Sequence, residues 1–196
     1  AHQEETGLSR SQYPEMFLRV PTSITGHLQD LQVPKAPYDK AFDFEGELAV
    51  IIGKPGRYIA EKDALSHIAG YSSYNEGSVR AYQRHNKQFG LGKNFERSGS
   101  FGPWLMTADE FGDYRKQRVI TRLNGAEKQN CPLAEMLNSV ENQIAYLSEG
   151  ITLQPGDVIA TGTPGSLPGT DKHMFAGDVC EVEITGLGVL RNKVGK

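Results

Sequence analysis

The sequence predicts a single α+β domain in which β-strands dominate and short helices pack on the outside. Its 196 residues suffice for one domain with its own apolar core, so we expect residues 1–196 to form one unit. The 22 glycines and 10 prolines are spread along the chain and separate short apolar segments, which is typical of a fold with many strands and turns. Only one segment has the spacing of a long amphipathic helix.

Several segments have the length and composition of β-strands. The clearest covers residues 47–53 (ELAVIIG), which are apolar after the first residue and therefore predict a strand covered on both faces. Asn124-Gly125 lies between two strand-like segments and predicts a hairpin with a type I′ turn. The remaining strands are expected at residues 70–74, 119–123, 126–129, 157–161 and 178–185.

Helical spacing is convincing in one place. An apolar stripe predicts a helix that ends near Gly150, and its members are Leu133, Met136, Leu137, Val140, Ile144 and Leu147. A shorter helix is expected at residues 60–68. Residues 1–34 are expected to be loops. Residues 75–104 are polar and glycine-rich, and such a long stretch inside a compact domain is either functional or disordered.

Composition excludes several classes of partner. The net charge is −3 and no cluster of Lys and Arg stands out, which argues against a nucleic-acid partner. No apolar run is long enough to span a bilayer, so we expect no membrane partner either. Cys131 and Cys180 stand in unrelated contexts without metal-ligand spacing. Two reduced thiols of this kind favour the cytoplasm.

Three carboxylates at alternate positions precede the predicted buried strand. In an extended segment, Asp43, Glu45 and Glu47 leave the same face, with about 6.5–7 Å between successive members. Such a row repels itself unless a positive charge lies among its members, and Mg²⁺, Mn²⁺ and Ca²⁺ all prefer oxygen ligands. The alternative is a solvated edge strand. The buried run that follows favours the metal site.

Further candidates follow along the chain. Glu76 follows another predicted strand and is a possible third carboxylate, although a surface Glu is the ordinary expectation. If the next residues are helical, Arg80 and Gln83 project on the same side as Glu76, and an Arg there can bind a carboxylate in bidentate fashion. A solvated helix face explains this spacing equally well.

Two loops have weaker signals. Lys93 lies in a glycine-rich loop without a phosphate-loop motif, and it is either solvated or placed to neutralise an oxyanion. The segment containing Gly162 and Thr163 follows a strand and can direct backbone N–H groups toward an anion, or it is only a turn.

The histidines give no strong functional signal by themselves. His2 and Glu5 form an H-x-x-E pair that would orient an imidazole as a base, yet residues so near a chain end are ordinarily frayed. The other histidines have no metal-ligand spacing and receive no role; they are His27, His67, His85 and His173.

Several stretches together resemble the fumarylacetoacetate hydrolase family over essentially the whole chain. They are EETGLSRSQYPEMFLRVPTS, DFEGELAVIIGK, YNEGSVRAYQ, GKNFERSGSFGPW, LQPGDVIATGTPGS and AGDVCEVEITGLGVLRNKV. The resemblance implies mixed β-sheets rolled into a β-sandwich-like barrel, a homodimer, and a Mg²⁺ or Mn²⁺ ion. It also implies a small oxo-acid substrate.

The resemblance assigns roles by position. The metal ligands would be Glu45, Glu47 and Glu76, the last of which stands where the family usually has Asp. The substrate would contact Arg80, Gln83, Lys93, Gly162 and Thr163. The dyad that acts when a lid closes would be His2 and Glu5. Relatives carry several dozen residues before this histidine, so we expect an N-terminal segment to be missing from this chain.

The function implied is hydrolysis of a C–C bond in an acylpyruvate-like β-diketo acid through a metal-stabilised enolate. The alternatives within the family are decarboxylation of oxaloacetate and isomerisation or hydration of unsaturated oxo-diacids from aromatic catabolism. An alternative of another class is a catalytically silent member that binds metal and ligand without turnover.

Overall fold

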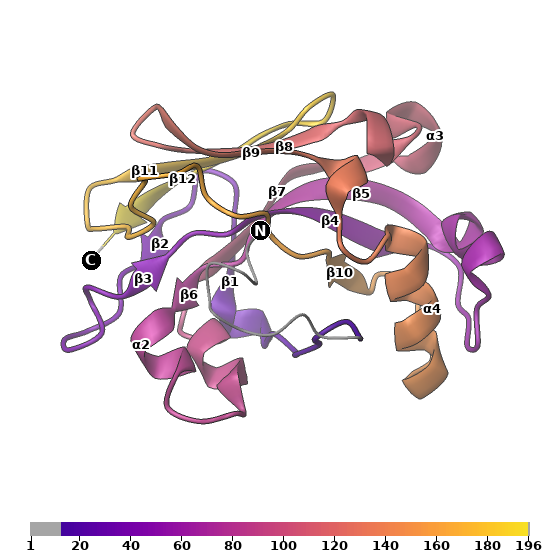
Figure 1. The fold of residues 1–196 in the computed structure, drawn as a ribbon, viewed down its shortest axis with the longest axis horizontal. Coiled ribbons are helices and arrows are strands. Elements are labelled where there is room, and N and C mark those ends of the chain that lie inside the picture. The colour runs from indigo at the N-terminus through magenta and orange to yellow at the C-terminus, as the bar shows by residue number, and fades with distance from the viewer. Residues whose placement is uncertain (1–12, 196) are drawn as a thin grey trace.

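A computed structural model describes residues 13–195, and its architecture is two β-sheets packed face to face with short helices around them (Figure 1). The expected β-dominated α+β fold, rolled into a sandwich-like half-barrel, is therefore confirmed. In the described part of the chain no helix is long and apolar enough to cross a membrane.

The first sheet has five strands in the order β1-β7-β5-β4-β10. Its β1–β7 pair is parallel and the other three pairs are antiparallel. The strands are β1 (Ile24–Gly26), β4 (Gly46–Ile52), β5 (Ile68–Asn75), β7 (Gly99–Thr107) and β10 (Val158–Ala160). Every residue of β4 is buried, as predicted for a strand covered on both faces.

The second sheet also has five strands, in the order β2-β12-β11-β8-β9. These are β2 (Leu31–Gln32), β8 (Arg118–Leu123), β9 (Ala126–Pro132), β11 (Val179–Ile184) and β12 (Gly188–Gly195). The predicted hairpin joins β8 to β9, and both turn residues have positive φ, 52° at Asn124 and 79° at Gly125, as a type I′ turn requires. A separate two-stranded ribbon pairs β3 (Phe42–Asp43) with β6 (Ser78–Val79).

Helical elements are short, and the longest, α4, lies outside the sheets beside β10 (Figure 1). The α-helices are α2 (Arg80–Gln83), α3 (Ala108–Phe111) and α4 (Val140–Gly150). The 3₁₀ turns are η1 (Pro21–Ser23), η2 (Glu61–His67), η3 (Phe89–Lys93), η4 (Tyr114–Lys116) and η5 (Leu133–Glu135).

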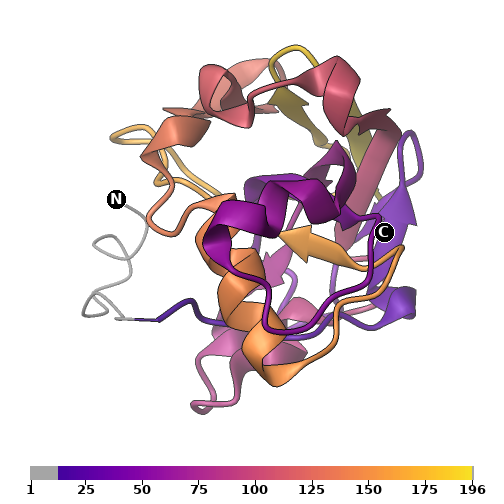
Figure 2. The ribbon, with the colours of Figure 1, turned by 90° about the vertical axis from the view of Figure 1, so that its right-hand side faces the viewer.

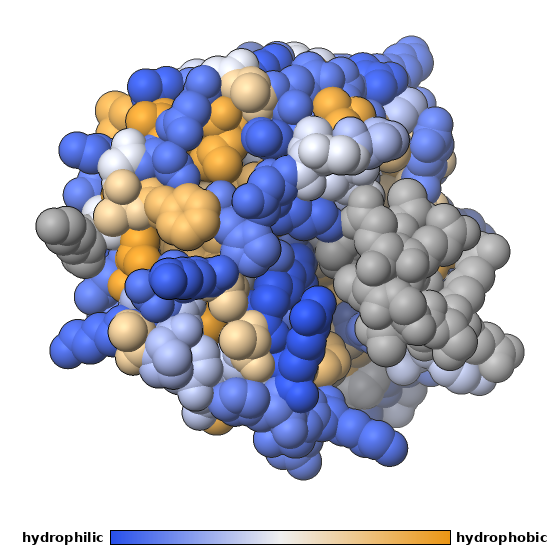
Figure 3. Space-filling model, turned by 60° about the vertical axis from the view of Figure 1, so that its left-hand side comes forward, coloured by the Kyte–Doolittle hydropathy of each residue, from blue (hydrophilic) through white to orange (hydrophobic). Residues whose placement is uncertain are grey.

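The main core fills the space between the two sheets, which surround it in the end-on view of Figure 2. It joins side chains of β4, β5 and β10 to those of β8, β11 and β12, and Val140 and Ile144 of α4 close one side. A smaller cluster packs beneath the β3–β6 ribbon around Phe42 and Phe44. On the face shown in Figure 3, apolar side chains form separate patches among hydrophilic ones.

Two expectations were wrong in part, and for residues 75–104 the structure excludes one of the two alternatives. The helix predicted from Leu133 begins only at Val140, because the Ser139 hydroxyl accepts the Asn142 N–H at 3.1 Å as an N-cap and leaves η5 as a separate turn. Residues 1–34, expected to be loops, contain β1 and β2 within their described part. The polar stretch at residues 75–104 is ordered and includes β6, α2, η3 and the first half of β7.

Candidate functional site

The segment from Asp43 to Glu47 is not one continuous strand, contrary to the prediction. Asp43 ends β3, whereas Glu47 lies in β4, and Phe44 and Glu45 connect the two. The break occurs because β3 pairs with β6 while β4 pairs with β5. The three carboxylates therefore do not belong to one strand, and the Asp43 carboxylate pairs with Arg80, which also pairs with Glu45.

Glycine at position 46 is required by this close packing. A Cβ at Gly46 would lie 2.0 Å from Thr121 Oγ1 on β8. The Gly46 N–H donates to Gln129 Oε1 of β9 at 3.0 Å. The start of β4 is thus pressed directly against the second sheet, which places the site where the two sheets meet.

The three predicted metal ligands lie together in the interior. Glu45 and Glu47 are each 4% exposed and Glu76 is 2% exposed. Neighbouring strands bring them together, because Gly46 pairs with Asn75 across β4 and β5, and the Glu76 N–H donates to the Glu45 carbonyl at 2.8 Å. A cluster of buried carboxylates is electrostatically unfavourable unless positive charge compensates it.

Side-chain cations compensate two of the three carboxylates. Lys93, predicted as a loop lysine, is buried; its Nζ donates to Glu45 Oε2 at 2.7 Å and to Ser78 Oγ at 2.6 Å. Arg80 also pairs with Glu45. Arg19 pairs with Glu76.

Arg19 is a site residue that sequence reasoning missed. Its Nη2 donates to the Ser23 carbonyl at 3.0 Å and to Ser98 Oγ at 2.8 Å, and its Nη1 donates to the Gly77 carbonyl at 3.2 Å. These bonds fix the guanidinium beside Glu76. No local signal marked it, since its partner is 57 residues away. The missed Gln129 lies in β9 of the predicted hairpin and is 1% exposed.

Glu47 differs from its two neighbours. Among the described residues no Lys, Arg or His lies within ion-pair distance of it, and its Oε2 accepts the Gly162 N–H at 2.9 Å. Burial, together with the charges of Glu76 and Glu45, raises the pKa of Glu47 well above its usual range. Burial likewise raises the pKa of Glu76, although Arg19 acts against it.

The loop after β10 was expected to direct backbone N–H groups toward an anion. The structure shows that the Gly162 N–H is directed at the Glu47 carboxylate, and the φ of +97° at Gly162 suits glycine. Thr163 Oγ1 donates to the Gly46 carbonyl at 3.1 Å and accepts from Gln129 Nε2 at 2.9 Å. The loop is thereby tied to both sheets.

Arg80 and Gln83 lie on one side of α2, as the helical spacing predicted, and Arg80 Nη1 donates to Gln83 Oε1 at 3.0 Å. Glu76 precedes this helix, so it is positioned by β5 rather than by α2. His2 and Glu5 lie outside the described residues, so the predicted dyad stays a prediction.

The donor set fits a hard divalent cation. All three candidate ligands are carboxylates, which such ions prefer, and Glu47 lacks a cationic partner among the described residues. Within residues 13–195, however, no three His, Cys, Asp or Glu side chains converge closely enough to form a preassembled metal site. Side-chain pairing explains this in part, because Arg19, Arg80 and Lys93 hold Glu76 and Glu45.

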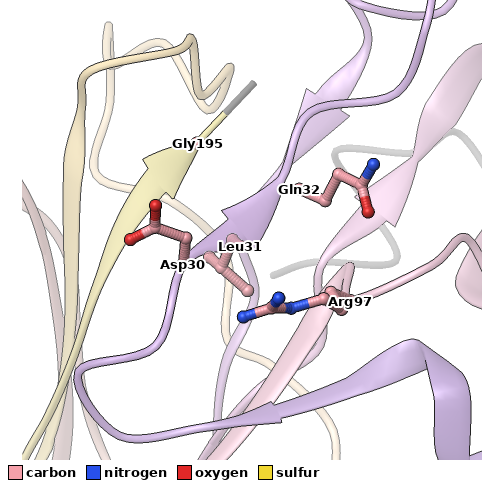
Figure 4. A pocket seen from close by; sticks show the side chains of 5 residues that line it. All are labelled: Asp30, Leu31, Gln32, Arg97 and Gly195. Carbon is pink, nitrogen blue, oxygen red and sulfur yellow. The ribbon is translucent and has the colours of Figure 1, made fainter.

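A pocket of about 260 Å³ lies elsewhere, where Arg97 faces the paired ends of β2 and β12 (Figure 4). It is lined by Asp30, Leu31, Gln32, Arg97 and Gly195. None of these belongs to the carboxylate cluster, so the pocket is not part of the candidate site.

Known proteins share the sequence pattern and the fold of this chain. The family model described as "Fumarylacetoacetate (FAA) hydrolase C-terminal" matches residues 1–195. The chain belongs to the fumarylacetoacetate hydrolase family. This confirms the resemblance noted in the sequence.

Relatives within the family differ in the reactions for which they are named. Oxaloacetate tautomerase YisK of Bacillus subtilis is 35% identical over 189 residues, covering 94% of this chain and 62% of its own length. The structure of 2-hydroxyhepta-2,4-diene-1,7-dioate isomerase from Mycobacterium marinum matches with a TM-score of 0.82 and 32% identity, covering 91% of this chain and 68% of that one.

A third relative was solved with ligands. The structure of fumarylpyruvate hydrolase from Pseudomonas aeruginosa, in complex with Mn²⁺ and pyruvate, matches with a TM-score of 0.88 and 28% identity. The match covers 100% of this chain and 84% of that one. Family members named as tautomerase, isomerase and hydrolase therefore share this fold.

Proposed function

We propose that this chain is the metal-binding part of an enzyme that forms or resolves the enolate of a small 2-oxo acid. The observation that carries the proposal is the buried set of Glu45, Glu47 and Glu76, in which Glu47 has no cationic partner among the described residues. Interconversion of enol- and keto-oxaloacetate is the first reaction to test, because YisK is named for it.

The cation in this proposal is Mg²⁺ or Mn²⁺, held by Glu45, Glu47 and Glu76. When bound, such an ion supplies Lewis acidity that stabilises the negative charge of an enolate. Mn²⁺ gains support from the relative solved with Mn²⁺ and pyruvate. Ca²⁺ also takes oxygen ligands and would compete for the site without being the functional ion.

The surrounding residues have distinct roles in the proposal. Arg80 binds the substrate carboxylate through its Nη groups, and Gln83 fixes the guanidinium through Nη1. The Lys93 ammonium, held between Glu45 and Ser78, neutralises the developing oxyanion. Gly162 and Thr163 shape the opposite wall, since their loop is fixed to β4 and β9.

Hydrolytic C–C cleavage of an acylpyruvate-like substrate is the second candidate. The structural likeness to fumarylpyruvate hydrolase favours it. This reaction needs a base that takes a proton from water, and His2 oriented by Glu5 is the predicted base. Decarboxylation of oxaloacetate and isomerisation of an oxo-diacid need the same enolate but no attacking water.

The test uses purified protein stripped with EDTA and reloaded with Mg²⁺ or Mn²⁺. We expect metal-dependent loss of enol-oxaloacetate, and the same preparation is assayed for keto-oxaloacetate decarboxylation and acylpyruvate cleavage. Glu47→Gln should abolish metal binding in calorimetry together with turnover. Asp63→Asn, at an exposed aspartate of η2, should change neither.

Turnover that survives in the EDTA-treated protein would show that the metal is not involved, and turnover that survives in Glu47→Gln would show that Glu47 is not a required ligand. Binding of Mn²⁺ and of an oxo-acid without turnover of any of the three substrates would instead identify a silent member that serves as a binding protein.

A further inference from the structure

Asp43 is a buried acid that the proposed function leaves without a role. Its side chain is 7% exposed. Oδ2 accepts a hydrogen bond from Arg80 Nε at 2.8 Å. Oδ1 is buried and has no hydrogen-bond partner among the described residues. A buried polar atom without a partner is unfavourable, so the groups around it are informative.

His173 faces this oxygen from the other side. Its Nε2 lies 3.7 Å from Asp43 Oδ1, and its Nδ1 lies 2.6 Å from Asp171 Oδ1. Two backbone links keep the two segments together: a bridge between Asp43 and His173, and a bond from the Met174 N–H to the Phe42 carbonyl at 2.7 Å. The histidine is therefore held against β3 by its own main chain.

The contact with Asp171 decides which proton His173 carries. The His173 backbone N–H also donates to Asp171 Oδ1, and this bond lowers the pKa of Asp171 and keeps it ionised as an acceptor. The short Nδ1 contact then requires the ring proton on Nδ1. Nε2 consequently directs a lone pair at Asp43 in the neutral ring, and an N–H in the imidazolium. At 3.7 Å the Nε2 atom is beyond hydrogen-bond distance of Asp43 Oδ1, so the ring lies against this carboxylate.

Arg80 gains its orientation from this arrangement. Its Nε is held by Asp43, its Nη1 by Gln83, and its Nη2 by Glu45. The proposed function assigns Glu45 to the cation, which leaves the Nη2 group for a substrate carboxylate. Asp43 is then the remaining anion that fixes the guanidinium by its Nε edge and keeps the Nη edge directed inward.

We propose that Asp43 and His173 are positioning residues for Arg80, in which His173 lies between Asp171 and Asp43 and holds the Asp43 carboxylate so that the guanidinium is fixed for the carboxylate of the 2-oxo acid. This inference rests on the proposed function. It divides the D-x-E-x-E pattern into two tasks: Glu45 and Glu47 serve the cation, whereas Asp43 serves the substrate. It also connects the segment with Asp171 and His173, which follows the Thr163 loop, to Arg80 through Asp43.

The experiment measures metal and substrate separately. Calorimetry follows Mn²⁺ alone, and then pyruvate in the presence of Mn²⁺, for the wild type and for Asp43→Asn, His173→Gln and the surface control Asp63→Asn. The asparagine variant preserves shape and an acceptor for Arg80 but removes the charge. We expect unchanged Mn²⁺ affinity in all variants, about tenfold weaker pyruvate binding in Asp43→Asn, and about threefold weaker binding in His173→Gln.

Kinetics provide a second readout. Because Arg80 contacts the carboxylate in ground state and transition state alike, KM for oxaloacetate should rise in Asp43→Asn while kcat changes little. Mn²⁺ affinity that falls in Asp43→Asn would make Asp43 a metal ligand and overturn the proposal. Pyruvate binding equal to that of the wild type in Asp43→Asn would overturn it as well, and an unaltered His173→Gln would remove His173 from it. Failure of the wild type to bind pyruvate would instead reject the proposed function, and this inference with it.

Discussion

At the residue scale, Glu47 is the side chain whose charge state matters most. Its pKa is raised above the value in an unfolded chain, chiefly by burial and then by its acidic neighbours. Its contribution to stability is therefore fully present below the unfolded pKa and is lost as pH rises through the folded pKa. At neutral pH, above the unfolded pKa, the raised pKa of Glu47 therefore lowers the stability of the metal-free protein.

Glu47→Gln should consequently raise the melting temperature of the metal-free protein at neutral pH, and the gain should shrink as the pH is lowered toward the acid range. The same substitution should remove the stabilisation that Mn²⁺ gives the wild type. Scanning calorimetry with and without Mn²⁺ measures both effects, with Glu149→Gln at the exposed end of α4 as the control. A lower melting temperature of metal-free Glu47→Gln would contradict the conclusion that the Glu47 carboxylate destabilises the metal-free protein.

Arg19 offers the complementary case of a buried cation. Arg19→Met leaves Glu76 without its partner and should destabilise the protein by about 3–5 kcal/mol, as for a broken buried ion pair. Glu76→Gln in the same chain should recover much of this loss, because the uncompensated charge is then gone. Denaturant unfolding of the single and double variants forms a double-mutant cycle. Additive effects would show that the two side chains do not interact.

At the scale of elements, the packing of β4 against β8 depends on a missing side chain. Gly46→Ala would place a Cβ 2.0 Å from Thr121 Oγ1, so we expect a loss of about 1–3 kcal/mol in unfolding free energy. Gly90→Ala is the matched control, because no atom lies within 4 Å of its Cβ position. Thr121→Ala combined with Gly46→Ala should restore part of the loss. Equal unfolding free energies of Gly46→Ala and Gly90→Ala would show that β4 can shift to accommodate the added methyl group.

Elements with a strong local signal could be predicted, and those defined by distant partners could not. β4 is readable because it is apolar on both faces, and the β8–β9 hairpin because Asn-Gly suits its turn. β7 was missed, since glycines and a proline interrupt its first half and pairing with β5 and β1 stabilises it. The N-cap at Ser139 was a readable signal that the apolar spacing concealed.

The candidate site shows the same division. Glu45, Glu47 and Glu76 were predicted because acids at strand ends stand out, and the structure buries all three near the adjoining ends of β4 and β5, although not close enough for a preassembled metal site in the described residues. Sequence reasoning placed Asp43 with them, although the chain breaks between β3 and β4 and its carboxylate binds Arg80. Arg19 and Gln129 stayed hidden, because their partners lie 57 and 83 residues away. Long-range pairing leaves no periodicity to read.

At the scale of the whole molecule, the homodimer implied by the family resemblance is still a prediction. Trp104 and Leu105 of β7 are 55% and 46% exposed, and in the described part of the chain β1 pairs with β7 only as far as Phe101. This edge is the expected interface. Trp104→Asp should convert a dimer to a monomer in light scattering, whereas Leu65→Asp, at an exposed position of η2, should not. A monomeric wild type at micromolar concentration would contradict the predicted homodimer.

The hydrogen bonds of Gln129 with Gly46 and Thr163 imply that ligand binding depends on the stability of the whole sandwich. The proposed ligand Glu47 lies in the first sheet, whereas Gln129, which binds the adjoining Gly46 N–H and Thr163, comes from the second. A molecule whose sheets have separated therefore has no site, and any ligand bound there selects fully folded chains. Core substitutions far from the carboxylates will lower the fraction of folded molecules and will thereby weaken the apparent affinity for the ligand. Natural variants that look like binding defects in this protein can thus originate anywhere in the sandwich.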